Sequence, residues 1–160
     1  MRAVHTTIPI TIRLQQDDFD VSREIRSLTR GRTDIGALVS FNGICRGGGE
    51  GGIITGLTLE HYPGMAYTEI RRHVDEAITR WPLTGVTVIH RYGRLAPGDN
   101  IVLVLTASAH RQAAFLSAEF LMDYLKVNAP FWKSEQYARG ASWVDSHGHD
   151  DDAIARWNAS

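Results

Sequence analysis

At 160 residues, the chain suits a single domain that can bury a substantial core. It carries 17 lysines and arginines against 18 aspartates and glutamates, so it lacks the overall positive charge with which proteins attract nucleic acid or anionic membranes. A single cysteine excludes an internal disulfide and a cysteine-based zinc cluster, and no apolar run is long enough to span a membrane.

The opening residues, MRAVHTTIPITIRL, lack the apolar segment of a signal peptide. One cysteine also fits a reducing compartment. We therefore expect a cytoplasmic protein that binds neither nucleic acid nor membrane. Any site for an anion must then be local.

The N-terminal third alternates strand and helix patterns. Apolar residues at every second position from Ile8 to Leu14 predict a strand with one buried face. Asp20 can cap a short helix that ends before Gly31. The segment GALVSFNGI, residues 36–44, predicts a second strand.

The second strand leads through Cys45 and Arg46 into the glycine-rich run GGGEGG, residues 47–52. This run is not a Walker loop, because no Gly-Lys-Ser/Thr follows it. We expect a mobile flap, since so many glycines do not hold one shape without a partner. Arg46 then stands at a strand end, where binding sites are often built.

The middle of the chain predicts three strands and one long helix. Helical spacing of apolar residues runs from Ile70 to Trp81 and stops at Pro82, while the tetrapeptide HYPG at 61–64 is expected to turn the chain. The expected strands cover residues 54–60, 86–91 and 101–109. The last of these is apolar almost throughout, so we expect it to be central and covered on both faces.

A second long helix follows, with an apolar stripe of alanines and leucines at three- and four-residue steps. The stripe comprises Ala114, Ala118, Leu121 and Leu125. Ser108 is a plausible N-cap, which would place His110 and Arg111 in the first turn. A cation is unfavourable there, so Arg111 either shares an anion with the helix N-terminus or pairs with an acid at the surface.

Two lysines flank the exit of this helix. Lys126 falls in the last turn, where complementing the helix dipole is a sufficient explanation. Lys133 lies beyond Pro130 and the apolar run 129–132, which should hold an extended segment against the core and aim the ammonium group.

The remaining residues predict two short strands, at 131–137 and 142–145, and a polar tail. Several strands follow one another without a helix between them, which favours an α+β fold with a mixed or antiparallel sheet and two long helices. We predict one catalytic domain over residues 1–145 and a C-terminal tail over 146–160. The tail's His147, His149 and Asp150–Asp152 form either a metal cluster or a solvated terminus.

Cys45 beside Arg46 is either an activated nucleophile or a small buried residue. No histidine stands near it in the sequence to act as its base. What remains is a set of cationic side chains suited to an anionic small molecule and to charge that develops at a carbonyl or phosphoryl centre. The set comprises Arg46, His110, Arg111, Lys126 and Lys133.

Several long motifs resemble the MoaE family, the large, catalytic subunits of molybdopterin synthase. They are LEHYPGM at 59–65, RWPL and VTVIHR within 80–91, PGD at 97–99, SAHR at 108–111, and MDYLK and APFWK within 122–133. They occur in order between Gly36 and Trp143. The resemblance implies an α/β-hammerhead fold, no cofactor and no metal.

The resemblance also implies a reaction. Sulfur passes from the thiocarboxylate at the Gly-Gly C-terminus of a small ubiquitin-like partner to cyclic pyranopterin monophosphate, a sulfurtransferase reaction that makes molybdopterin. A homodimer of this chain within a heterotetramer is implied as well.

By resemblance, each residue of the cationic set receives a role. Arg46, His110 and Arg111 are implied to bind the pterin phosphate, while Lys126 and Lys133 are catalytic and lie beside the partner's tail. The pocket is implied to include Ser134, Glu135 and the backbone of Ile44 and Cys45.

The chain departs from the family near His147, where the family commonly has another basic residue, so either His147 or Arg139 could supply that contact. The alternative to catalysis is a binding module that uses the same pocket for a phosphorylated ligand or a partner's C-terminal carboxylate.

Overall fold

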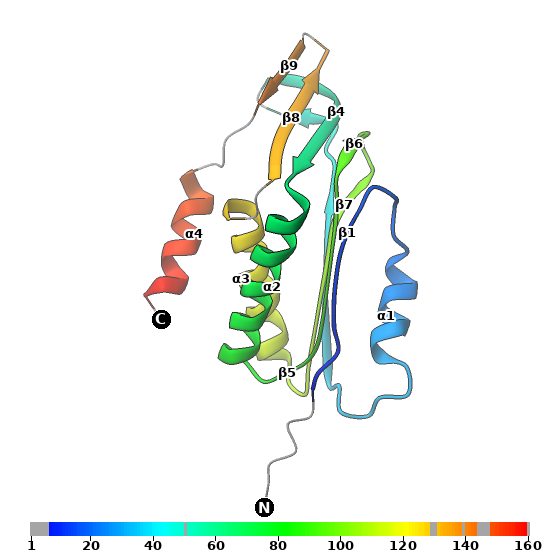
Figure 1. The fold of residues 1–160 in the computed structure, drawn as a ribbon, viewed down its shortest axis with the longest axis vertical. Helices are drawn as coiled ribbons and strands as arrows, with labels where there is room; N and C mark the ends of the chain where they lie inside the picture. Colours follow the sequence, from blue (N-terminus) through cyan, green and yellow to red (C-terminus); the bar gives the residue numbers. More distant parts are fainter. Residues whose placement is uncertain (1–6, 50, 129–130, 139, 144–147, 160) are drawn as a thin grey trace, which may run out of the picture.

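A computed structural model describes residues 7–49, 51–128, 131–138, 140–143 and 148–159 (Figure 1). The described helices are α1 Val21–Thr29, α2 Pro63–Arg80, α3 Arg111–Val127 and α4 Gly148–Asn158. The described strands are β1 Ile10–Gln15, β2 Ala37–Ile44, β3 Gly48–Gly49, β4 Gly52–His61, β5 Leu83–Arg91, β6 Gly93–Leu95, β7 Asn100–Ser108, β8 Phe131–Tyr137 and β9 Gly140–Trp143. The predicted α+β fold with two long helices is confirmed.

The larger sheet is mixed and has the strand order β1-β5-β7-β2. β1 runs parallel to β5, while β7 runs antiparallel to both of its neighbours. The helices α2 and α3 cover one face and α1 covers the other (Figure 1). β7 is therefore an inner strand covered on both faces, as its apolar sequence predicted.

The side chains of the two inner strands, β5 and β7, point alternately into two cores, one on each face of the sheet. Val88 and Val104 point to the core beneath α2 and α3, whereas Ile89 and Leu103 point to the core beneath α1. All four are fully buried. A strand with both faces covered needs apolar residues at successive positions, which explains the nearly continuous apolar run of β7.

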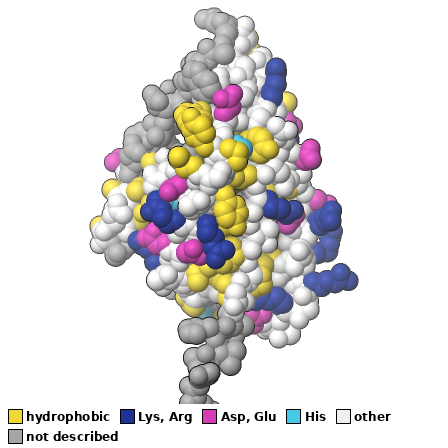
Figure 2. Space-filling view, viewed as in Figure 1, with side chains coloured by type: hydrophobic (Ala, Val, Ile, Leu, Met, Phe, Trp, Pro, Cys, Tyr) yellow, Lys and Arg dark blue, Asp and Glu magenta, His cyan; other side chains and the backbone are white. Residues whose placement is uncertain are grey.

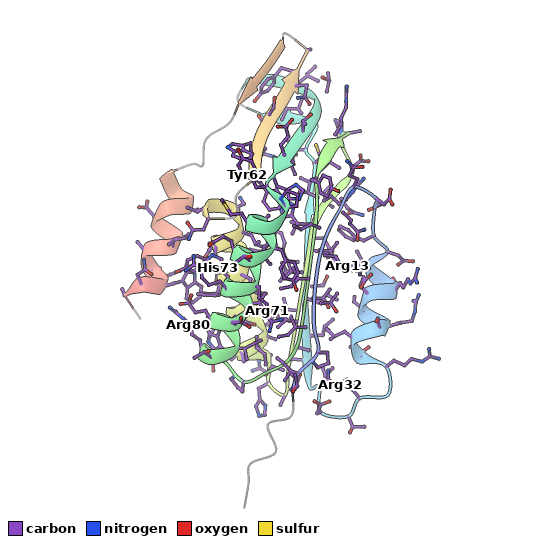
Figure 3. The ribbon with its side chains drawn as sticks, in the orientation of Figure 1. Arg13, Arg32, Tyr62, Arg71, His73 and Arg80 are labelled. Atoms are coloured by element: carbon purple, nitrogen blue, oxygen red, sulfur yellow. The ribbon has the colours of Figure 1, made fainter. Side chains whose placement is uncertain are left out.

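The outer face of α2 is polar, and its inner face packs against α3. Arg71 pairs with Asp75 at 3.0 Å and Arg80 with Glu76 at 2.9 Å, each one turn along the helix (Figure 3). His73 is buried and stacks on Tyr124 of α3. Across the viewed surface, basic and acidic side chains are interspersed (Figure 2), in keeping with the near-zero net charge.

A second sheet stands at the end of the first where β2 finishes (Figure 1). Its order is β3-β4-β8-β9, and β6 also pairs with β4. β4 and β8 are antiparallel, with Leu59 opposite Lys133 and Leu57 opposite Glu135. This register places Lys133 and Glu135 on the same face of the sheet, because strand side chains alternate.

The start of α3 differs from the prediction. Ser108 is the last residue of β7, and its hydroxyl donates to the carbonyl of Pro82 at 2.9 Å instead of capping the helix. His110 occupies the N-cap position, and Arg111 is the first helical residue. The predicted cap was wrong because the buried strand continues to Ser108.

The C-terminal segment was predicted as a solvated tail, and for α4 this was wrong. Trp157 is only 7% exposed, packs edge-on against Phe120, and donates from Nε1 to Asp123 at 2.6 Å. Arg156 contacts Glu119 at 2.9 Å. The polar composition concealed a short apolar face, Ile154 and Trp157, which docks on the core.

Two local predictions also need correction. Part of the glycine-rich run forms a hairpin, with Gly49 opposite Gly52 in the β3–β4 pair. The predicted turn at 61–64 is shorter than expected, because Pro63 begins α2, a position where its fixed φ is favourable. Among the described helices, none has the length and apolarity required for a membrane span.

Candidate functional site

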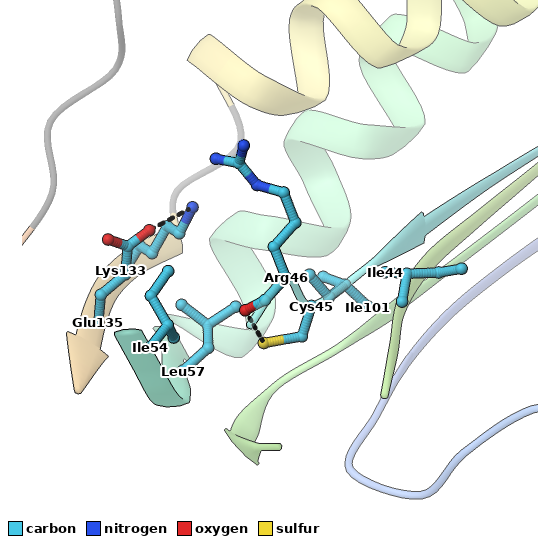
Figure 4. Close-up of a pocket in the computed structure, with 8 residues that line it drawn as sticks. All are labelled: Ile44, Cys45, Arg46, Ile54, Leu57, Ile101, Lys133 and Glu135. Carbon is cyan, nitrogen blue, oxygen red and sulfur yellow. Dashed lines mark hydrogen bonds and ion pairs between the residues drawn. The ribbon is translucent and has the colours of Figure 1, made fainter. Parts of the chain in front are cut away.

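A pocket forms where the end of β2 meets the second sheet (Figure 4). It is lined by Ile44, Cys45, Arg46, Ile54, Leu57, Ile101, Lys133 and Glu135. Its volume is about 60 Å³, well below the roughly 300–1,000 Å³ typical of sites that enclose a drug-sized ligand. The pocket suits a slender group, such as an extended backbone, better than a whole pterin.

The strand end that carries Cys45 and Arg46 is anchored by backbone hydrogen bonds to the β6–β7 turn. The amide of Cys45 donates to the backbone carbonyl of Asp99 at 2.8 Å, and the amide of Gly98 donates to the carbonyl of Cys45 at 2.8 Å. Gly98 has a φ of +91°, which glycine adopts readily. The glycine of the PGD motif thus permits the turn that fixes one wall of the pocket.

Lys133 and Glu135 form an ion pair at the opposite wall, with Nζ 3.2 Å from Oε1 (Figure 4). The Lys133 side chain is 41% exposed and that of Glu135 is 11% exposed. Tyr137 donates its hydroxyl to the second carboxylate oxygen of Glu135. The ammonium group is therefore held at the pocket by a buried carboxylate that is itself held from the other side.

These contacts determine the ionisation of Glu135. Burial alone would raise its pKa, but hydrogen bonds from Tyr137 and Lys133 and the charges of Lys133 and Arg46 together lower the pKa below its usual value. Glu135 is an anion at neutral pH.

The surroundings of Cys45 do not favour a thiolate. Burial and the charge of Asp99 raise the pKa of its thiol, and the opposing charge of Lys133 is too small to reverse the shift. Cys45 as a whole is 5% exposed, and its Sγ lies 3.8 Å from the carbonyl oxygen of Arg46. Of the two interpretations from the sequence, the small buried residue is the better supported.

The structure brings several predicted site residues together and separates others. Ile44, Cys45, Arg46, Lys133 and Glu135 all line the pocket. Ser134 is buried on the opposite face of β8, where its hydroxyl accepts from Gln136 at 3.3 Å.

His110, Arg111 and Lys126 lie outside the residues that line the pocket. His110 and Arg111 are exposed at the start of α3, and Lys126 is exposed in its last turn. The helix has 17 residues and rises about 24 Å. Arg111 therefore lies far from Lys133, because β8 follows shortly after the end of α3.

The sheet gives the same separation independently. Ala37 of β2 pairs with Ser108, beside the start of α3, whereas Ile44 pairs with Asn100 at the pocket end. Seven residue steps along a strand correspond to about 23 Å. In one copy of the chain, Arg111 and Lys133 therefore cannot contact the same small molecule.

Sequence reasoning missed Tyr137 and the apolar walls Ile54, Leu57 and Ile101. The only signal for Tyr137 was the two-residue period of β8, which puts residues 133, 135 and 137 on one side. His147 and Arg139, the candidates for an additional basic contact, lie outside the described residues. Within the described part of the chain, no three His, Cys, Asp or Glu side chains gather as metal ligands.

Comparison with known proteins gives consistent matches. The model of the family described as "MoaE protein" matches residues 14–128. The molybdopterin synthase catalytic subunit of Mesorhizobium japonicum is 57% identical over 152 residues, which cover 94% of this chain and 94% of that protein. The subunit of the same name from Rhizobium meliloti is 55% identical over 151 residues, covering 93% of this chain and 96% of that protein.

Solved structures agree with these matches. The molybdopterin biosynthesis MoaE protein from Burkholderia ambifaria superposes with a TM-score of 0.79 at 46% identity, covering 93% of this chain and 98% of that one. A complex of subunits 1 and 2 of the molybdopterin-converting factor from Helicobacter pylori contains a chain that matches with a TM-score of 0.65 at 20% identity, covering 86% and 91%. At that identity, the second match shows a shared fold.

Proposed function

Since the chain belongs to the MoaE family, with relatives named molybdopterin synthase catalytic subunit, we propose that it transfers sulfur from a small partner protein to a pterin. Family membership makes it a transferase of molybdenum cofactor biosynthesis. The proposed donor is the C-terminal thiocarboxylate of a ubiquitin-like subunit that ends in Gly-Gly. The proposed acceptor is cyclic pyranopterin monophosphate, and we expect the reaction to occur in the cytoplasm.

The shape of the pocket is the observation that carries this proposal. A cavity of about 60 Å³ with apolar walls and two cations, Arg46 and Lys133, suits a narrow chain that ends in an anion. Glycine residues fit such a passage because they have no side chain to collide with its walls. The terminal thiocarboxylate would then meet the ammonium group of Lys133.

Lys133 is the side chain best placed for the chemistry. Once the thiocarboxylate sulfur has bonded to the pterin as a thioester, water attacks the thioester carbonyl carbon and negative charge develops on its oxygen. The C–S bond then breaks, which leaves the sulfur on the pterin and an ordinary carboxylate on the partner, and a nearby ammonium group stabilises the charge. Lys126 is retained as a second catalytic residue in the proposal, at the end of α3 that leads into β8. Ile44 and Cys45 would contribute a wall of the passage.

The proposal assigns Arg46, His110 and Arg111 to the pterin phosphate. Because Arg46 lines the pocket, the separation along α3 then requires His110 and Arg111 to come from a second copy of the chain. β2 is an edge strand of its sheet. Antiparallel pairing of two β2 edges would bring the Ala37 end of one copy beside the Ile44 end of the other. The second copy's Arg111 would thereby approach the first copy's pocket.

Exposed apolar side chains support such a dimer. Phe41 on β2 is 39% exposed, and Phe115 on the neighbouring α3 is 62% exposed. Among the described strands, β2 pairs on one side only, and such an edge beside exposed aromatic residues is a surface that a second copy can cover. A two-fold arrangement of this kind creates two equivalent sites.

Reconstitution tests the proposal. Purified protein mixed with cyclic pyranopterin monophosphate should form no dithiolene until the thiocarboxylated partner is added, and the partner's ordinary carboxylate form should bind without reacting. Dithiolene formed without a partner would refute the mechanism. Stable binding of the thiocarboxylated partner without product would instead support a binding module.

A further inference from the structure

Tyr137 lies at the end of β8, just beyond the residues that line the pocket. It shares the face of β8 that carries Lys133 and Glu135, because alternate residues of a strand point the same way. Its hydroxyl donates to Oε2 of Glu135, whose Oε1 is 3.2 Å from Nζ of Lys133. The three side chains form a continuous row that ends at the pocket.

The glycine hairpin lies against the ring of Tyr137. A Cβ added to Gly51 would be 2.9 Å from both Cε1 and Cζ of that ring, closer than Cβ atoms approach other heavy atoms. One added to Gly49 would be 3.2 Å from Cδ1 of Ile54, a pocket residue. The absence of a side chain at position 51 therefore lets the hairpin hold the ring in place.

Building on the proposed function, we propose that Tyr137 is a positioning residue that holds Glu135, and through it Lys133, in the geometry required for sulfur transfer. Gly51 contributes by leaving room for the ring. Tyr137 is not among the residues that line the pocket, so in this proposal it acts through Glu135. The glycine-rich run thus has a function beyond allowing a turn.

The groups around Glu135 determine how this should appear in a pH profile. Lys133 and Tyr137 contact it from β8, and Arg46 and Cys45 face it from the end of β2. The hydrogen bond from Tyr137 is one of the contacts that lower the pKa of Glu135. The ionised carboxylate persists above this pKa and is lost as the pH falls through it, so the pair limits activity on the acid side.

The test is Tyr137→Phe, which removes the hydroxyl and keeps the ring. We expect kcat to fall about tenfold, with unchanged affinity for the carboxylate form of the partner. The acid limb of the kcat profile should move to higher pH, and titration of Glu135 followed by carboxyl NMR should move in the same direction. Tyr67→Phe, at a residue of α2 that is 45% exposed, is the matched control and should change none of these values.

Gly51→Ala provides a second route to the same defect, because its methyl group would displace the ring. Like Tyr137→Phe, it should move the acid limb of the kcat profile to higher pH. The double variant should add little, since both changes disrupt the same contact between Tyr137 and Glu135. A normal acid limb and a normal Glu135 titration in Tyr137→Phe would overturn the inference. A fall in kcat accompanied only by lower thermal stability would overturn it as well.

These outcomes are separate from failure of the proposed function. If the wild-type protein forms no product from the thiocarboxylated partner, the proposed reaction is wrong. The NMR titration of Glu135 still decides whether Tyr137 sets its ionisation, since that measurement needs no turnover. If the wild type is active and Tyr137→Phe matches it at every pH, only the positioning role is wrong.

Discussion

A heterodimer of two defective chains offers the most direct test of a site shared between two copies. One chain carries Arg111→Ala and the other carries Lys133→Ala, and two different affinity tags allow the mixed dimer to be purified. If Arg111 of one copy serves the pocket of the other, both substitutions fall in the same site. The second site of the mixed dimer then keeps both wild-type side chains.

The expected magnitude follows from the geometry. Arg111 and the pocket are separated by a helix that rises about 24 Å, so one copy cannot use both side chains on one substrate. The mixed dimer should therefore retain about half of the wild-type activity, because one of its two equivalent sites is intact. A site built within a single copy would instead leave each site with one defect.

The assay measures initial rates of product formation with a saturating thiocarboxylated partner and a pterin concentration below its Kd. Under these conditions, loss of Arg111 costs about 1.5–3 kcal/mol of binding, which lowers the rate at least about tenfold. Mixed-dimer activity below about one-tenth of wild type would refute the shared site. Each homodimeric variant, measured in parallel, supplies the baseline.

Three further predictions concern single residues. Lys133→Ala should lower the rate of sulfur transfer about 100-fold. Its thermal midpoint should fall only slightly, because the Lys133 side chain is 41% exposed and Glu135 keeps its hydrogen bond from Tyr137. A near-normal rate would remove the catalytic assignment. His90 is buried and stacks on Phe131, and burial lowers its pKa to about 4. In the unfolded chain, His90 binds its proton near pH 6.5. The free energy of unfolding should therefore fall by up to about 3 kcal/mol between about pH 6.5 and pH 4. Urea titrations across this range should show a smaller fall in His90→Gln. Trp157→Ala should lower the free energy of unfolding by about 3 kcal/mol. The control, Arg156→Ala, loses only exposed ion pairs and should lower it by less than about 1 kcal/mol. Equal effects would mean that α4 does not dock through Trp157.

Periodicity predicted the parts of the fold whose side chains report directly on burial. The stripe from Ala114 to Leu125 on α3 and the continuous apolar run of β7 both describe surfaces packed against a core, and both predictions are confirmed. The boundary between β7 and α3 was harder to predict, because a serine such as Ser108 suits both a buried strand end and a helix N-cap. Its hydrogen bond to Pro82 depends on a residue 26 positions away, which local patterns do not contain.

The location of the site was only partly predictable. Arg46 follows the end of β2 in one sheet, and Lys133 lies on β8 in the other. Their approach depends on how the two sheets meet, so spacing in the sequence could not reveal it. The two-residue period of β8 does separate Glu135 from Ser134 and connects it with Tyr137. Docking of α4 was hidden for another reason: its apolar contact with the core comes from only two residues of a polar segment, Ile154 and Trp157.

The distribution of charge explains why the proposed site needs other chains. At the pocket, the cations Arg46 and Lys133 face the anion Glu135, and Glu135 already engages the ammonium group of Lys133. The charged residues that line the pocket therefore carry one net positive charge. Arg111 stands at the opposite end of α3, so the proposal draws its contact with the pterin phosphate from a second copy. In the proposal, the partner supplies the sulfur, a second copy supplies the phosphate contacts, and each chain alone holds only part of the charge that the reaction requires.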